Sequence, residues 1–170
     1  MILHDIASLI KGYMGLTDNQ IWLKNEKAPK PIDRTLFVEL GFMSLKPIGS
    51  SIVNDTTTVG TTVIYRESLK TNMQAIVEIN IAGRTFDVIN RKEEIIGALR
   101  SSNSREMQCS KGCFIGSHPL TMIDISELDG VEIPYRYNMT YAVQYLVTTT
   151  HTTTYYDTIY LDTTTIGVKT

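Results

Sequence analysis

Two cysteines, a histidine and an aspartate are the residues of this sequence whose types and spacing come closest to a reactive site. Cys109 and Cys113 stand four apart in the segment CSKGC, and His118 and Asp124 follow them. A cysteine beside a histidine and a carboxylate can form an activated thiolate, which is a nucleophile. A histidine before a proline in a polar loop more often has no catalytic part, so we expect no catalytic residue here.

The same two cysteines are also possible ligands or disulfide partners. A structural zinc site needs about four ligands, and of the three histidines only His118 lies close to CSKGC. A disulfide across this short loop would be disfavoured in a reducing cytoplasm. We interpret both residues as free, at least partly buried thiols, and expect neither a metal nor a cofactor.

Known catalytic motifs give no further candidate. The sequence contains no G-x-S-x-G, no Walker-type glycine loop, no G-x-G-x-x-G and no H-E-x-x-H. Glu93 and Glu94 are paired carboxylates, but neighbours on a helix point about 100° apart, which favours a solvated face. We therefore expect that the protein is not an enzyme.

The last third of the chain is rich in tyrosine and threonine. It holds seven of the nine tyrosines, at 135, 137, 141, 145, 155, 156 and 160, in extended segments. Tyrosine is favoured where surfaces meet because its rigid apolar ring carries a polar tip. Core packing, a protein interface and a sugar-binding surface all remain open for these side chains.

The threonines make the end of the chain more distinctive. Eight of the 22 threonines fall between Thr152 and Thr170, and threonine favours strands but fills a dry core poorly. Ordering such a segment costs ~1 to 2 kcal/mol of backbone entropy per residue. We expect it to recover this cost by pairing with another subunit.

Hydrophobic periodicity predicts the elements that position these residues. It indicates a helix from Ile2 to Gly15 with a stripe of Ile2, Ile6, Leu9, Ile10 and Tyr13. It indicates a second helix over 84–102 with Thr85 as N-cap and a stripe of Phe86, Ile89, Ile96 and Leu99. It indicates strands over 21–23, 36–43, 60–67, 73–81, 112–116, 121–125 and 131–150, and a last one from Tyr155 to Val168. Residues 68–72 should join two antiparallel neighbours, 101–119 should hold little beyond the short strand at 112–116, and 46–58 should form a long loop or projecting hairpin arm.

The predicted fold class is α+β: a mixed, mostly antiparallel sheet with two main helices on one face and an extended C-terminal strand region. Residues 1–150 would form the domain, and 151–170 an extended arm of the same domain or between subunits. The 170 residues, 42% hydrophobic and 20% charged, suit one folded domain.

A net charge of -2 argues against tight nucleic-acid binding, and the absence of a long apolar run argues against a membrane span. We expect the chain to be intracellular when made.

Several segments in this order resemble the bacteriophage neck and tail terminator family. They are the first helix, NEKAPKP leading into TLFVELGF, the strands VIYRESL and MQAIVEINIAG, and the helix FDVINRKEEIIGALR. The resemblance covers roughly Ile2 to Leu99, with the strand 135–147 as a further match. It departs from the family in the threonine-rich C-terminus and in CSKGC.

Membership would imply a virion subunit without catalytic residues, assembled in the bacterial host cytoplasm. Such subunits usually form a six-membered ring that caps the finished tail tube and joins it to the head-completion or connector protein. Genomic DNA would pass through the lumen without specific binding, which mild acidity favours. Head-closure, adaptor and tail tube proteins are alternatives, as is a carbohydrate-binding tail module.

A ring joins its subunits head to tail, so two different surfaces must complement each other. We expect one surface on the arm at 46–58 and the other on 149–168. The residues predicted to lie at these interfaces are Lys46, Ser50, Asn54, Asp55, Tyr155, Tyr156, Tyr160 and Ile166.

Overall fold

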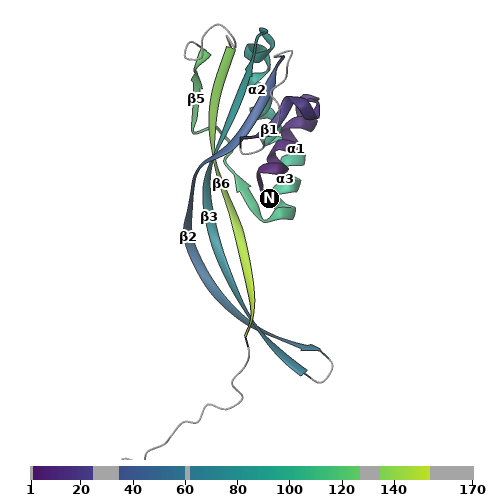
Figure 1. The fold of residues 1–170 in the computed structure, drawn as a ribbon, viewed down its shortest axis with the longest axis vertical. Coiled ribbons are helices and arrows are strands. Elements are labelled where there is room, and N and C mark those ends of the chain that lie inside the picture. Colours follow the sequence, from purple (N-terminus) through teal and green to yellow (C-terminus); the bar gives the residue numbers. More distant parts are fainter. Residues whose placement is uncertain (1, 25–34, 60–61, 127–134, 154–170) are drawn as a thin grey trace, which may run out of the picture. The chain divides into compact units, whose positions relative to one another are not determined.

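The computed structural model describes residues 2–24, 35–59, 62–126 and 135–153. Its helices are α1 (Ile2–Met14), the short 3-10 helix η1 (Asp18–Gln20), α2 (Asp87–Arg100) and α3 (Ser102–Lys111). Its strands are β1 (Ile21–Leu23), β2 (Phe37–Val59), β3 (Thr62–Gly83), β4 (Cys113–Ile115), β5 (Thr121–Asp124) and β6 (Tyr135–Thr153) (Figure 1). The predicted α+β class is confirmed.

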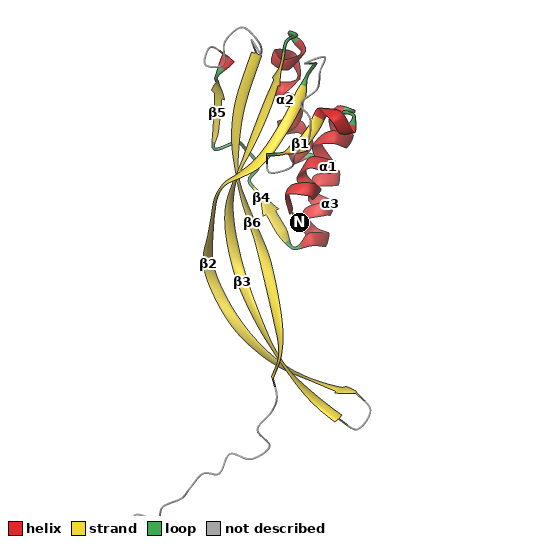
Figure 2. Ribbon diagram, in the orientation of Figure 1, coloured by secondary structure: helices red, strands yellow, loops and turns green. Residues whose placement is uncertain are grey.

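The strands form one mixed sheet in the order β1-β2-β3-β6-β4, and β5 also pairs with β6. β1 runs parallel to β2, with Ile21 opposite Val38, whereas β4 and β5 run antiparallel to β6. β2 and β3 follow each other too closely in the chain for a crossover, so they form an antiparallel hairpin. The arrows in Figure 2 show β3 running opposite to both β2 and β6.

The chain divides into two compact units. The first comprises Met1–Gly49 and Thr71–Val147, and the second comprises Ser50–Lys70 and Thr148–Thr170. The first unit holds all of the described helices and the hydrophobic core. In the second unit the described residues belong to β2, β3 and β6. The predicted arm at 151–170 lies outside the described residues beyond Thr153.

The core of the first unit lies between the sheet and the helices, which all lie on one face (Figure 2). Side chains alternate between the two faces of a strand, and every second residue is buried: Val38 and Leu40 on β2, Ala75, Val77, Ile79 and Ile81 on β3, and Met139, Tyr141 and Val143 on β6. Burying an apolar side chain of this size contributes about 1.5 to 3 kcal/mol. The predicted alternation of β3 and β6 is therefore confirmed over these residues.

α1 is an amphipathic helix, as predicted, but its buried stripe differs in part from the expected one. Ile2, Ile6, Ile10 and Met14 recur every four residues and are buried, together with Leu3. Tyr13, which we expected on this face, is 54% exposed. Gly15 ends the helix with φ of 65°, a left-handed conformation that glycine adopts at little cost.

Two details predicted for α2 are wrong. The N-cap position belongs to Phe86 in a helical conformation, and the Thr85 hydroxyl donates to Asp87 at 3.0 Å instead of capping the helix. The buried stripe is Val88, Ile95, Ala98 and Leu99, so only Leu99 was placed correctly. Phe86 is 67% exposed and its ring lies against that of Tyr135.

The helix α3 was not predicted from the sequence. Its residues are mostly polar and only Ser104 is buried, so it has no apolar stripe. It is held by local hydrogen bonds: the Ser101 hydroxyl accepts from the Ser104 amide at 3.2 Å, and Gly112 ends it with φ of 59°. Gln108 then ties α3 to β4, because its Oε1 accepts from the Ile115 amide at 2.9 Å.

Two predicted interruptions of the sheet are also wrong. Residues 68–72, expected to join two strands, lie inside the single strand β3. Residues 46–58, expected as a loop or a hairpin arm, belong to β2 and its hairpin with β3, so the hairpin alternative is correct and the loop is not. Proline and small polar residues indicated a loop there, but the pairing of β2 with β3 holds these residues in a strand.

Candidate assembly interface

The structure does not assemble the cysteine, histidine and aspartate of the sequence into a site. Cys113 pairs with Tyr145 on β6 and Asp124 pairs with Tyr137. These partners are eight residues apart on an extended strand, a distance of about 26 Å. No cluster of three or more histidine, cysteine or acidic side chains that could hold a metal occurs in the described part of the chain.

Both cysteines are free thiols in the structure. Cys109 is exposed, so the burial predicted for it is wrong, whereas Cys113 is half-buried as predicted, with its Sγ 3.9 Å from the Met107 sulfur. Burial, together with the nearby charge of Asp5, raises the pKa of the Cys113 thiol. A raised pKa lowers the thiolate fraction at neutral pH, which makes Cys113 a poor nucleophile.

The residues predicted to lie at subunit interfaces are only partly described. Lys46, Ser50, Asn54 and Asp55 all lie on β2 and are exposed. Lys46 belongs to the first unit and the other three to the second. Tyr155, Tyr156, Tyr160 and Ile166 lie outside the described residues.

The tyrosines of β6 face the core side of the sheet. Tyr141 is 1% exposed, and Tyr135, Tyr137 and Tyr145 pack against the core. The Lys92 ammonium lies 5.0 Å from the centre of the Tyr137 ring, an arrangement that stabilises a cation by its attraction to the ring. Within the described residues, β6 therefore does not present a row of tyrosines to a sugar.

The first of two open edges belongs to β2. β1 pairs with β2 only from Val38 to Leu40, and the Lys24 amide then donates to the Leu40 carbonyl at 2.8 Å. From Gly41 onward no described strand pairs with this side of β2. An unpaired edge of this length presents a row of backbone N–H and C=O groups that another strand can pair with.

The second open edge belongs to β6, on the opposite side of the sheet. β5 pairs with β6 from Tyr137 to Thr140, and β4 pairs with it from Val143 to Tyr145. Past Tyr145, none of the strands in the described ranges pairs with that side. β2 and β6 run in the same direction, so the two open edges are parallel to each other (Figure 2).

The sheet face turned away from the helices carries exposed apolar side chains. By alternation from the buried positions, this face includes Met43 and Leu45 on β2 and Leu146 on β6, which are 68%, 50% and 47% exposed. Phe114 and Ile123 share it, because they pair with Gln144 and Asn138. Exposed apolar side chains gathered on one surface indicate a contact site for another protein.

A polar cluster occupies the middle of the same face. The Glu78 carboxylate accepts hydrogen bonds from Lys24, Asn80 and Asn138, and Asn138 also donates to the Asn80 side-chain oxygen at 2.8 Å. Lys24 reaches Glu78 across Gly41, where a Cβ would lie only 2.8 Å from its Cδ. Burial alone would raise the pKa of Glu78, but the hydrogen bonds and the charge of Lys24 lower it overall.

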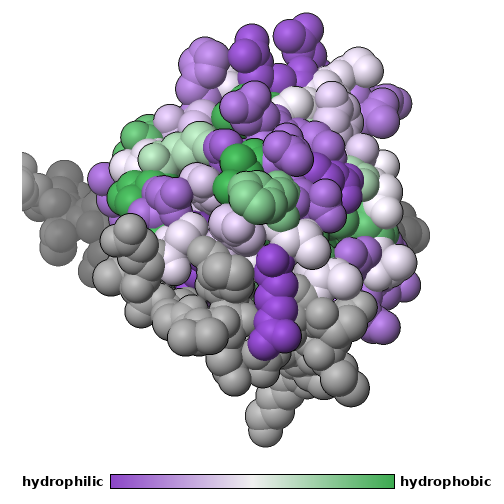
Figure 3. All heavy atoms as spheres, turned by 90° about the horizontal axis from the view of Figure 1, so that it is seen from above, coloured by the Kyte–Doolittle hydropathy of each residue, from purple (hydrophilic) through white to green (hydrophobic). Residues whose placement is uncertain are grey.

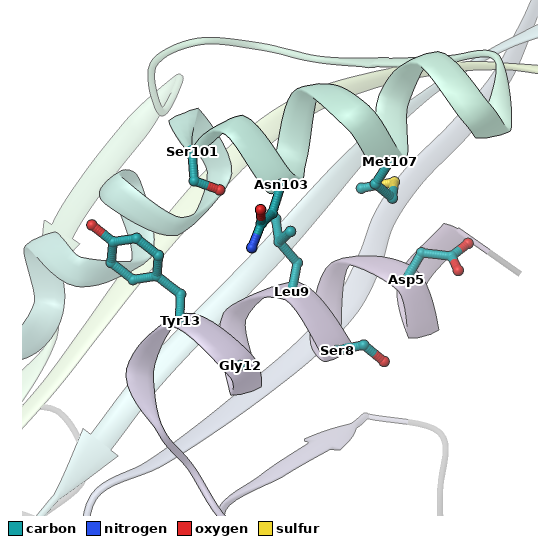
Figure 4. Close-up of a pocket in the computed structure, with 8 residues that line it drawn as sticks. All are labelled: Asp5, Ser8, Leu9, Gly12, Tyr13, Ser101, Asn103 and Met107. Atoms are coloured by element: carbon teal, nitrogen blue, oxygen red, sulfur yellow. The ribbon is translucent and has the colours of Figure 1, made fainter.

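A shallow pocket of about 550 Å³ lies between α1 and α3. Its lining residues are Asp5, Ser8, Leu9, Gly12, Tyr13, Ser101, Asn103 and Met107 (Figure 4). Leu9 and Tyr13 point from α1 toward α3, where Asn103 lies. The lining combines apolar and neutral polar groups with a single carboxylate, so it offers no convergent set of catalytic side chains.

The end of the molecule seen in Figure 3 is predominantly polar, with small apolar patches between the polar side chains. The described part of the chain contains no helix with the length and hydropathy needed to cross a membrane. A scan against protein-family models and a search of curated proteins find no match to this chain.

Proposed function

We propose that this chain is a structural subunit of a bacteriophage neck or tail. Copies of it form a homo-oligomeric ring, six-membered as in the family that the sequence resembles, which ends the tail tube and joins it to the connector on the head side. It acts in the virion after assembly in the host cytoplasm, and DNA passes through the ring without specific binding.

The observation that carries this proposal is the pair of open strand edges on opposite sides of one sheet. A ring needs two different surfaces that complement each other, because each subunit contacts the next one head to tail. An edge of β2 and an edge of β6, pointing in the same direction, meet that requirement. A closed ring also removes the free edges, which otherwise favour aggregation.

Two further observations support a structural role. Cys113 on β4 and Asp124 on β5 pair with β6 residues that are eight positions apart, so the two side chains do not share a site. The exposed Lys46, Ser50, Asn54 and Asp55 add polar side chains along the open strand β2. Polar groups around an apolar contact are usual at the rim of a protein interface.

Native mass spectrometry of the purified chain, alone and with preformed tail tubes of the same phage, tests the proposal. Six copies of the 19.1 kDa chain give a particle of about 115 kDa. Electron microscopy should then show a ring at tube ends and no further tube growth. A chain that polymerises into tubes by itself would instead be a tube protein, and one that stays single and ignores tube ends would contradict the proposal.

A further inference from the structure

We infer that neighbouring copies join by direct strand pairing, with the edge of β6 in one copy running parallel to the edge of β2 in the next. This inference rests on the proposed ring and names the surfaces that build it. The residues at the junction belong to the first unit: Phe42 and Ser44 on β2, and Leu146 on β6.

Backbone direction identifies which groups face outward on β2. The Leu40 carbonyl points away from β3, because it accepts from the Lys24 amide beyond the edge. Backbone groups of every second residue point to the same side of a strand. Phe42 and Ser44 therefore present their N–H and C=O groups on the open edge.

The same reasoning applies to β6. The carbonyls of Thr140 and Ala142 point toward β5 and β4, since they accept from the amides of Leu120 at 2.7 Å and Gly116 at 2.9 Å. Leu146 lies on the same side by alternation, past the last residue that β4 covers. Its N–H and C=O are thus available to the second copy.

The side chains favour a second copy as the occupant of each edge. Met43 and Leu45 beside one edge and Leu146 at the other lie on the same sheet face, the one turned away from the helices. Continuing the sheet from one copy into the next keeps this face continuous. It would bring Leu146 of one copy beside Met43 and Leu45 of the next. These three side chains are 47% to 68% exposed in the single chain, and the contact would cover them.

Parallel pairing follows from the strand directions. β2 and β6 point the same way within one sheet, so a rotated copy that continues the sheet sets β6 beside β2 in parallel. A two-fold dimer would instead set β2 against β2, or β6 against β6, in antiparallel pairs. The two arrangements therefore differ in which residues meet.

The first test removes one backbone donor. Ser44→Pro deletes an N–H that faces outward and leaves the hydrogen bonds between β2 and β3 in place, whereas the matched control Ser44→Ala keeps the N–H. We expect native mass to fall from the ring to the single chain for Ser44→Pro only, with circular dichroism unchanged in both. An intact ring in Ser44→Pro would overturn the inference.

The second test leaves the edge backbone unchanged, so it remains informative if Ser44→Pro does not fold. Leu45→Cys and Leu146→Cys are made separately in a Cys109→Ser and Cys113→Ser chain, and each is treated with a short bismaleimide alone and after mixing. We expect crosslinked pairs only in the mixture of the two variants. Crosslinks within the Leu45→Cys sample alone, or a ring without crosslinks, would overturn the strand pairing while the ring stands. A chain that stays single even with tubes would overturn both proposals.

Discussion

The Tyr141 hydroxyl offers a quantitative test of how the core is built. The side chain is 1% exposed in the middle of β6, and its hydroxyl has no hydrogen-bond partner among the described residues. A buried polar group without a partner costs about 1 to 3 kcal/mol of folding free energy. Tyr141→Phe removes the hydroxyl and keeps the ring, so we expect the variant to be more stable than the natural chain by about 1 kcal/mol at pH 8.

The pH dependence of the same variant gives an independent magnitude. Burial raises the pKa of Tyr141 from 10.0 to about 12, although the charge of Arg100 acts in the opposite direction. Because the folded pKa lies above the unfolded one, ionisation of Tyr141 leaves stability unchanged well below pH 10 and lowers it as pH rises from 10 toward 12. At pH 11 the natural chain should have lost about 1 kcal/mol more than Tyr141→Phe, relative to pH 8.

Urea unfolding at pH 8 and pH 11 measures both quantities. Trp22 is the single tryptophan, and it is buried against Phe37 with ring centres 4.9 Å apart, so its fluorescence should report unfolding. All other ionisable groups are common to both chains, so their effects cancel in the difference. A Tyr141→Phe chain that is less stable at pH 8 would refute the unpartnered hydroxyl, and equal losses at pH 11 would refute its burial.

Three further predictions concern the polar cluster, a turn and the thiols. Glu78→Gln should lower the free energy of unfolding at pH 7. Because the folded pKa of Glu78 is lowered, the difference from the natural chain should shrink as pH falls below the ordinary glutamate range. Urea unfolding at pH 7 and pH 3.5 measures this difference. Gly112→Ala should cost about 1 to 2 kcal/mol in the same assay, since φ is 59° and a Cβ there would meet no atom within 4 Å, which leaves backbone strain as the cause. Cys109 should react with a thiol reagent at pH 8 well before Cys113, whose pKa is raised by burial, and equal rates would contradict the half-buried position.

Strong local periodicity allowed the core elements to be predicted from the sequence. α1 repeats its buried residues every four positions, and buried apolar residues recur at every second position on β3 (Val77, Ile79) and on β6 (Tyr141, Val143). These patterns result from burial on one face, so a single sequence is enough to read them. The α+β class follows from their order.

The elements that were missed lack such a pattern. α3 buries only Ser104 and depends on hydrogen bonds from Ser101 and Gln108, which no hydrophobic period can reveal. β2 from Met43 to Asp55 is exposed at every position, so neither face shows the alternation that marks a strand. Its pairing with β3 supplies the strand geometry, and that contact lies outside any local window.

The sequence prediction and the structural proposal both place part of the candidate interface on β2, but they use different groups of that strand. The sequence pointed to polar side chains such as Lys46 and Asn54, which are exposed on β2. The groups proposed for the junction are backbone amides and carbonyls of Phe42, Ser44 and Leu146, and every residue type except proline carries both groups. Which of them are free depends on where β1 and β4 stop pairing, and only the fold determines that.

The backbone entropy already spent on ordering β2 favours pairing of its open edge with another strand. Ordering each of its residues costs ~1 to 2 kcal/mol of backbone entropy, yet from Met43 to Asp55 every side chain is exposed in the single chain. Within the chain this stretch is stabilised chiefly by its ladder with β3. A second ladder on its free edge would add hydrogen bonds without ordering β2 again, and it would cover Met43 and Leu45. Pairing with a second copy therefore costs the least backbone entropy at a strand that already pairs on one side. Both β2 and β6 meet this condition.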